Sequence, residues 1–166
     1  MVRRFPVNVS MQDIHMFLSF LKENGGEASI RAINSGMKSH NPPSASMLSV
    51  CEQLKVVMKR KTKVRIVKSV YAKKESEVEE LTKTRVRKLQ PFPTIIKLLK
   101  RHLELSTPDM FEILLKKKLI DYRDTLKELN RFHDDLLKSQ DGFKVFDYDP
   151  SNDLWSMYGS VLKRHS

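Results

Sequence analysis

Side chains that could carry catalysis or bind a metal ion are few in this chain of 166 residues. The histidines and the cysteine are His15, His40, His102, His133, His165 and Cys51. No two histidines lie four residues apart with a glutamate between them, and a single cysteine cannot build a structural zinc site. We therefore expect neither a metal ion nor a cofactor.

The acidic residues give no pattern typical of acid–base catalysis, which needs carboxylates held in a cleft with shifted pKa values. Asp134 and Asp135 lie beside His133, and a solvated helix face explains this group better than a catalytic dyad does. The five glycines form no phosphate-binding loop, and the GxSxG nucleophile motif is absent. We expect a protein that is not an enzyme.

The strongest local feature is a run of positive charge between residues 55 and 74, which contains no aspartate or glutamate. Its basic residues are Lys55, Lys59, Arg60, Lys61, Lys63, Arg65, Lys68, Lys73 and Lys74. Lysine and arginine bind nucleic-acid phosphates by releasing condensed counter-ions. The run predicts a surface for nucleic acid, either DNA or RNA, and DNA is favoured. The alternative is a charged surface that only aids solubility.

The charge is also unequal between the two halves of the chain. Residues 1–74 hold 14 lysines and arginines against 4 acids, whereas residues 75–166 hold 17 against 16. Most of the net charge of +11 therefore lies in the first half, and this favours a polyanionic partner for that half. Residues 105–160 carry 8 basic and 11 acidic groups, which suits them poorly to DNA.

Hydrophobic periodicity and turn signals divide the first half into short elements. The pattern predicts a first helix from the Ser10 cap to Asn24, with Ile14, Phe17, Leu18 and Leu21 buried, and then an edge strand at 28–30. A second helix follows over 31–38, with Ala32, Ile33 and Met37 inward. A third helix runs from Ser44 or Ser46 to about Lys59, with Met47, Val50, Cys51, Leu54, Val57 and Met58 buried, and one strand over 64–71 comes after it. This order resembles the winged helix-turn-helix superfamily over about residues 10–74.

The resemblance implies that the third helix and the following strand face a duplex. Base reading would come from Ser46, Ser49 and Gln53 on the polar face of that helix, with Lys55 and Arg60. Serine and glutamine discriminate bases weakly, so we expect contacts with the nucleic-acid backbone to dominate. An ordinary solvated helix face is the alternative for these residues.

The second half repeats this order after a connecting helix over 75–90. We expect one helix over 92–103 and a second that begins at Thr107. A third helix runs from the Asp121 cap to about Ser139 and is terminated by Gly142, with Tyr122, Leu126, Leu129, His133, Leu136 and Leu137 inward. A hairpin of 143–148 with 154–158 follows. The predicted fold is mainly α with small β-hairpins (α+β): a basic winged-helix-like module over 1–74, a helical linker over 75–91 and a second such module over 92–166.

Two further groups are candidates for binding. Basic residues at the junction of the modules could extend the cationic surface: Arg85, Arg87, Lys88, Lys97, Lys100 and Arg101. Aromatic residues of the second hairpin either pack in the core, which we favour, or dock a protein partner: Phe146, Tyr148, Trp155 and Tyr158. The second option defines the alternative function, a protein–protein interaction adaptor in a larger complex.

The sequence favours an intracellular location. One cysteine gives no internal disulfide, no segment approaches the roughly 20 apolar residues of a membrane helix, and the first residues lack the apolar core of a signal peptide. Residues 59–63 resemble a basic nuclear import signal, which favours the nucleus in a eukaryote. Binding to an anionic membrane is the weakest alternative, because the apolar helix faces are needed for the core.

Overall fold

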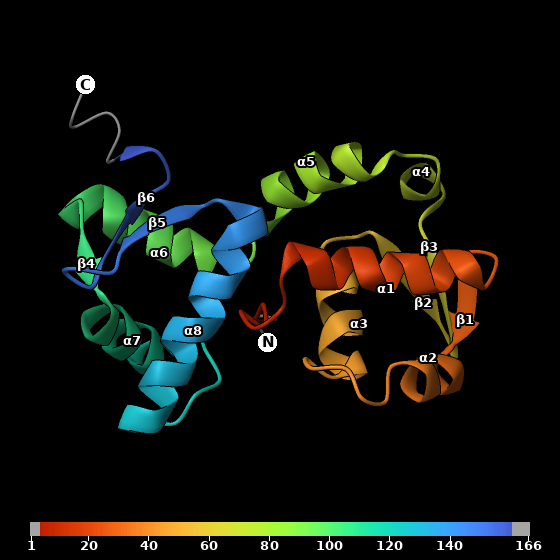
Figure 1. Cartoon of the computed structure of the whole chain (residues 1–166), viewed down its shortest axis with the longest axis horizontal. Coiled ribbons are helices and arrows are strands. Elements are labelled where there is room, and N and C mark those ends of the chain that lie inside the picture. The colour runs from red at the N-terminus through yellow and green to blue at the C-terminus, as the bar shows by residue number, and fades with distance from the viewer. Residues whose placement is uncertain (1–3, 161–166) are drawn as a thin grey trace.

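The computed structural model describes residues 4–160 and has eight helices and two small antiparallel sheets within that range (Figure 1). The predicted class, mainly α with small β-hairpins, is confirmed. In Figure 1 the two halves of the chain lie side by side, and α5 crosses between them along one edge. Within the described range, no helix combines the length and the apolar character needed to span a bilayer.

The first helix, α1 (Met11–Glu23), begins as the sequence predicts. The Ser10 hydroxyl accepts a hydrogen bond from the Asp13 amide at 3.2 Å, and the Asp13 carboxylate accepts one from the Ser10 amide at 2.9 Å. This capping box satisfies donors that the first turn leaves unpaired. The predicted inner face of Ile14, Phe17, Leu18 and Leu21 is buried.

The elements after α1 are β1 (Glu27–Ser29), α2 (Ile30–Gly36), α3 (Ser44–Gln53), β2 (Val57–Arg60), β3 (Lys63–Ile66) and α4 (Lys68–Tyr71). The edge strand and second helix match the expectation, although Ala32 is exposed rather than inward. Pro43, not a serine, occupies the N-cap of α3.

The end of the third helix was predicted wrongly. The helix ends at Gln53, and Lys55 adopts a positive φ of 59° that no continuing helix allows. The β-branched Val56 and Val57 then turn into β2, so residues 57–66 form a hairpin rather than a helix followed by one strand. Met58 consequently lies exposed on a strand, and Tyr71 belongs to the short helix α4.

Strand β3 is central in the first sheet, with the order β1-β3-β2. Val57 pairs with Ile66, and both side chains are buried. Because side chains alternate between faces, the pairs Met58–Arg65 and Arg60–Lys63 lie on the opposite, exposed face. One face of the hairpin therefore closes the core while the other carries charge.

The predicted connecting helix is α5 (Glu75–Val86), which packs through Val78, Thr82 and Val86. The second half contains α6 (Phe92–His102), β4 (Leu105–Ser106), α7 (Thr107–Lys116), α8 (Leu126–Phe143), β5 (Phe146–Asp149) and β6 (Leu154–Met157). Its sheet has the order β4-β6-β5, so the second half repeats the helix, strand, helix, helix, hairpin order and the sheet order of the first. The division into tandem winged-helix modules stays a prediction.

Several details of the second half differ from the expectation. Helix α8 begins at Leu126 after a Thr125 cap instead of after Asp121, and Leu126 is 73% exposed. Phe132 is buried in place of Leu126 and Leu137. Gly142 lies within α8, and Lys144 with φ 51° ends the helix instead. Helix α6 stops at His102, so Leu103, where the predicted helix ends, lies outside it and is exposed.

The two halves share one hydrophobic core. The N-terminal segment, residues 4–10, joins them, because Phe5, Val7 and Val9 are all buried. The Phe5 ring packs edge-on against Phe92 at 5.4 Å and Phe143 at 5.9 Å. Such aromatic pairs are favourable beyond their buried area. The segment thus packs residues from the start of the chain against helices of the second half.

Substituting Gly142 with alanine is expected to lower the free energy of unfolding by about 1–3 kcal/mol, the usual cost of overpacking. An added Cβ would lie 2.3 Å from the Met11 Cβ, where α8 crosses α1. A Cβ cannot rotate away, so the clash outweighs the higher helix propensity of alanine. Urea denaturation measures the loss.

Gly36→Ala is the matched control. The atom nearest to its added Cβ is on the ring edge of Phe20 at 2.4 Å, at the far end of a half-buried side chain. The ring can turn aside, so we expect a smaller loss. Equal losses for both variants, or a gain in stability for Gly142→Ala, would contradict the close approach of α1 and α8.

Candidate nucleic-acid interface

Positive charge is concentrated on the β2–β3 hairpin. We name the exposed basic residues of this hairpin the hairpin cluster: Lys59, Arg60, Lys61, Lys63 and Arg65. Arg60 and Lys63 are directly paired across the strands, and Arg65 lies on the same outer face. Like charges in directly opposed positions repel each other. Because both side chains are exposed, water or a bound anion can screen this repulsion.

The turn that connects the two strands is fixed by its neighbours. Lys61 has a φ of 54°, a left-handed conformation that costs a non-glycine residue about 1–2 kcal/mol. The carbonyl of Thr62 accepts a hydrogen bond from the Ile30 amide at 2.8 Å, which attaches the turn to the start of α2. The basic tip of the hairpin is therefore held in a defined position.

Carboxylates neutralise little of this charge. Within residues 4–160, Lys63 is the one member of the hairpin cluster that forms an ion pair, with Glu27 at 3.4 Å. Both partners are well exposed, and an exposed pair contributes about 0–1 kcal/mol. A phosphate can replace Glu27 at small cost, so the whole cluster is available to an anion.

The rest of the basic run lies at the other end of the hairpin. Lys68 belongs to α4, Lys73 and Lys74 follow it, and Lys55 precedes β2. Lys73 is half-buried, and the other three are exposed. Each strand has four residues and so spans about 13 Å, which separates these lysines from the hairpin tip. The run therefore forms two neighbouring groups.

The predicted base-reading residues on α3 are half-buried against the rest of the protein, unlike the exposed Lys55 and Arg60. Ser46, Ser49 and Gln53 are half-buried, and along α3, which the structure describes in full, Ala45 alone is exposed. The Gln53 amide donates to the Arg4 carbonyl at 3.3 Å and to the Ser49 hydroxyl at 3.2 Å. The N-terminal segment thus covers this face of α3.

Ser46 lies in a small cavity between the N-terminal segment and the second half, lined also by Asn8, Ile120 and Tyr122. It is therefore turned toward the junction of the two halves. The alternation of apolar residues at Phe5, Val7 and Val9 is the sequence signal that could have revealed this buried segment.

The junction residues divide into one structural arginine and several exposed surface cations. Arg85 is half-buried and donates to the carbonyls of Leu54 at 2.7 Å and Lys55 at 3.2 Å. It thereby satisfies carbonyls at the end of α3, a common use of a basic side chain. The exposed residues are Arg87, Lys88, Lys97, Lys100 and Arg101.

The aromatic residues of the second hairpin pack mainly inward. Phe146 and Trp155 are buried, and the Trp155 indole donates to the Thr107 hydroxyl at 2.9 Å. Tyr148 is half-buried, and its hydroxyl donates to Asp153 at 2.8 Å. Tyr158 is 51% exposed. One aromatic residue of the four is thus well exposed.

The candidate catalytic groups have ordinary structural roles. Asp135 accepts a hydrogen bond from the Tyr122 hydroxyl at 2.7 Å, and burial raises the pKa of both groups. His133 contacts the exposed Asp134 at 2.9 Å and packs against the Tyr148 ring. Cys51 is buried, and burial raises the pKa of its thiol well above the ordinary value, which disfavours the nucleophilic thiolate.

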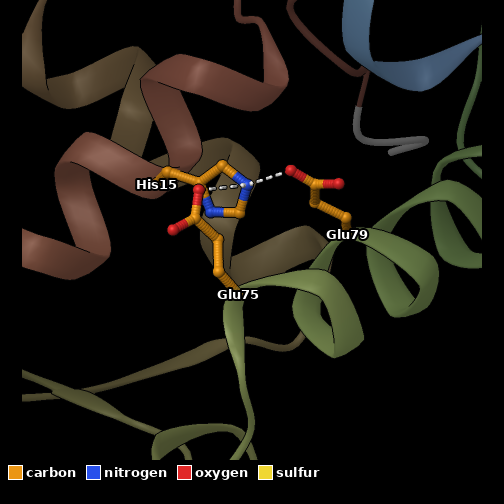
Figure 2. Close-up of side chains that lie close together, drawn as sticks. All are labelled: His15, Glu75 and Glu79. Atoms are coloured by element: carbon orange, nitrogen blue, oxygen red, sulfur yellow. Dashed lines mark hydrogen bonds and ion pairs between the residues drawn. The ribbon is translucent and has the colours of Figure 1, made fainter.

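Three residues that no sequence motif groups lie together in the folded chain (Figure 2). His15 on α1 faces Glu75 and Glu79 on α5, and their ligand atoms lie within 4.8 Å of one another. The spacing of four residues between the two glutamates is a visible signal, because it places them on one helix face. Nothing in the sequence links them to His15, 60 residues earlier.

No protein-family model, curated protein or solved structure matches the chain. Its function is therefore inferred from its own residues.

Arg85→Ala is expected to lower the free energy of unfolding by about 1–3 kcal/mol, because the carbonyls of Leu54 and Lys55 lose a charged donor and the bond to Leu54 is partly buried. Thermal or urea denaturation measures the effect. Arg87→Ala, two residues further on and exposed, is the matched control and should change stability by less than about 0.5 kcal/mol. Equal effects of the two variants would refute the capping role of Arg85.

Proposed function

We propose that this protein is a non-enzymatic nucleic-acid-binding protein that grips the backbone of duplex DNA through the hairpin cluster. The observation that carries the proposal is the concentration of five exposed cations on one fixed hairpin, of which Lys63 alone is ion-paired among the described residues. Each cation that contacts a phosphate releases condensed counter-ions, which supplies affinity without sequence reading.

The shape of the element favours DNA over RNA. A two-stranded ribbon fits the major groove of B-form DNA, about 12 Å wide, whereas the deep, narrow major groove of A-form RNA excludes it. In a groove or along its edge, Arg60 and Lys63 on the outer face reach one backbone while Lys61 extends from the tip. Lys68 and Lys74 follow the other end of the hairpin and are exposed, so we propose that they add contacts to the same backbone.

Backbone contacts dominate in this proposal because α3 is not free to enter a groove. Its polar residues are half-buried, and Gln53 is bonded to the N-terminal segment. A helix that reads bases must expose three or four side chains. We therefore propose modest sequence preference, with specificity arising from DNA shape if at all.

The second half would orient the complex. Residues 105–160 carry an excess of acids, so phosphates are repelled from that side and attracted to the hairpin. The alternative function, a protein-interaction adaptor, needs exposed aromatic anchors. With Phe146 and Trp155 buried, Tyr158 is the one well-exposed aromatic residue among the four of the second hairpin, and this favours the nucleic-acid proposal over an adaptor that docks through that hairpin.

Titrating the affinity for a duplex against salt is the direct test. We expect a log–log slope between about −3.6 and −6.3, which corresponds to roughly four to seven phosphate contacts. A mixed-sequence duplex of DNA and its RNA counterpart should be compared, and DNA should bind more tightly. A flat response to salt, or no binding near 50 mM salt, would remove the proposal.

Replacing Arg60, Lys61 and Lys63 together by alanine is expected to weaken binding and to reduce the slope by about 0.9 for each phosphate that is no longer neutralised. The matched control replaces Lys116, Lys117 and Lys118, which are also exposed. Each triplet removes three charges and contains one residue of positive φ, Lys61 or Lys118. Similar losses of affinity in both variants would show that net charge, not the hairpin, governs binding.

A further inference from the structure

We propose that His15, Glu75 and Glu79 form a binding site for a divalent transition-metal ion, with Zn²⁺ as the ion best suited to it. The site does not depend on the proposed nucleic-acid function, because it lies on α1 and α5 rather than on the hairpin. Figure 2 shows both carboxylates turned toward the imidazole of His15.

The geometry is close to what a metal requires. The His15 Nε2 atom lies 2.9 Å from the Glu79 Oε1 atom and 3.7 Å from the Glu75 Oε1 atom. Ligands of tetrahedral zinc at about 2.0–2.1 Å lie roughly 3.3 Å apart. The two separations from the imidazole bracket that value, and all three ligand atoms lie within 4.8 Å of one another, so shifts of about 1–2 Å in the flexible glutamate side chains would complete the arrangement.

The three proposed ligands differ in how much of each side chain is exposed to solvent. The side chain of His15 is 18% exposed, whereas those of Glu79 and Glu75 are 39% and 74% exposed. A largely buried imidazole is held in one place, and the more mobile carboxylates can close on an ion that arrives from solvent. The two glutamates lie four residues apart on one face of α5, which has a fixed backbone between them.

The donor set selects the class of ion. An imidazole nitrogen with two carboxylate oxygens suits Zn²⁺ and its transition-metal neighbours, whereas Mg²⁺ and Ca²⁺ prefer shells built from oxygen. Two carboxylates and a neutral imidazole also balance the charge of a divalent cation. Three protein ligands leave at least one position for water, as in open zinc sites.

The surroundings leave room for that water. The three residues line a cavity of about 550 Å³ together with Gln12, Ser19 and Asp141 among others. Lys138 also borders the cavity, and its ammonium lies 3.6 Å from the buried Asp13 carboxylate. Asp13 therefore offsets the one lysine charge that would oppose a cation at this cavity.

A simple ion pair between His15 and Glu79 is the competing explanation, and the two differ in what Glu75 does. An ion pair needs one carboxylate, and Glu75 at 3.7 Å adds little to it. A metal site needs both carboxylates. Binding a metal would cross-link α1 to α5 and stabilise the folded chain by mass action, while the ion pair alone gives no response to metal.

Calorimetric titration of the full chain with ZnCl₂ tests the proposal. We expect saturable binding that involves these residues, a rise in Tm with Zn²⁺, and a shift of the His15 imidazole NMR signals that the exposed His102 does not share. Glu75→Gln and Glu79→Gln keep the side-chain size and should each weaken this binding about tenfold or more, since even indirect partners of a metal contribute that much.

Glu80→Gln is the matched control, since Glu80 is an exposed glutamate of the same helix outside the proposed site. It should leave zinc affinity within about twofold of the parent. His15→Ala should abolish the site, with circular dichroism to confirm that the variant folds. Zinc binding unchanged in Glu75→Gln and in His15→Ala, or no saturable binding by the parent chain, overturns the proposal, and neither outcome affects the salt dependence expected for DNA.

Discussion

The cost of removing a cation from water determines how the first half of the chain presents its charge. In residues 57–66, apolar and basic side chains are so mixed that no helix could bury the former without burying the latter. A hairpin resolves the conflict, because alternate residues point to opposite faces. Val57, Val64 and Ile66 complete the core, and Arg60, Lys63 and Arg65 consequently share the exposed face.

The N-terminal segment imposes the second constraint on function. Its apolar residues pack against aromatic rings of the second half, and its backbone at Arg4 accepts a hydrogen bond from Gln53 on α3. The polar face of α3 therefore closes the junction instead of facing solvent. A structural requirement, the shared core of two small halves, thus leaves the polar residues of α3 half-buried, whereas the basic residues of the hairpin stay exposed.

Local signals in the sequence predicted most elements, and the errors have identifiable causes. Val57 and Met58 continue the helical spacing of Val50 and Leu54, so periodicity alone could not reveal that Lys55 ends the helix with a positive φ. Gly142 resembled a terminator, although its function is to let α8 approach Met11. The basic run was visible at once, but the partners of Gln53 and His15 are 49 and 64 residues away and depend on tertiary packing.

Helix α1 connects the two proposed sites, because it carries His15 in its first half and also packs against β1 and β3 of the sheet that includes the hairpin. A 13-residue helix is about 20 Å long and transmits position rigidly. Rigidity by itself couples nothing, since a ligand shifts an equilibrium only if it binds two states differently. Zinc bound between α1 and α5 would therefore change the affinity of the hairpin for DNA only if the protein had a second state in which α5 separates from α1. The buried Thr82 hydroxyl on α5 donates a hydrogen bond to the Met11 sulfur on α1, so separating the two helices would cost free energy. The two sites should therefore act independently.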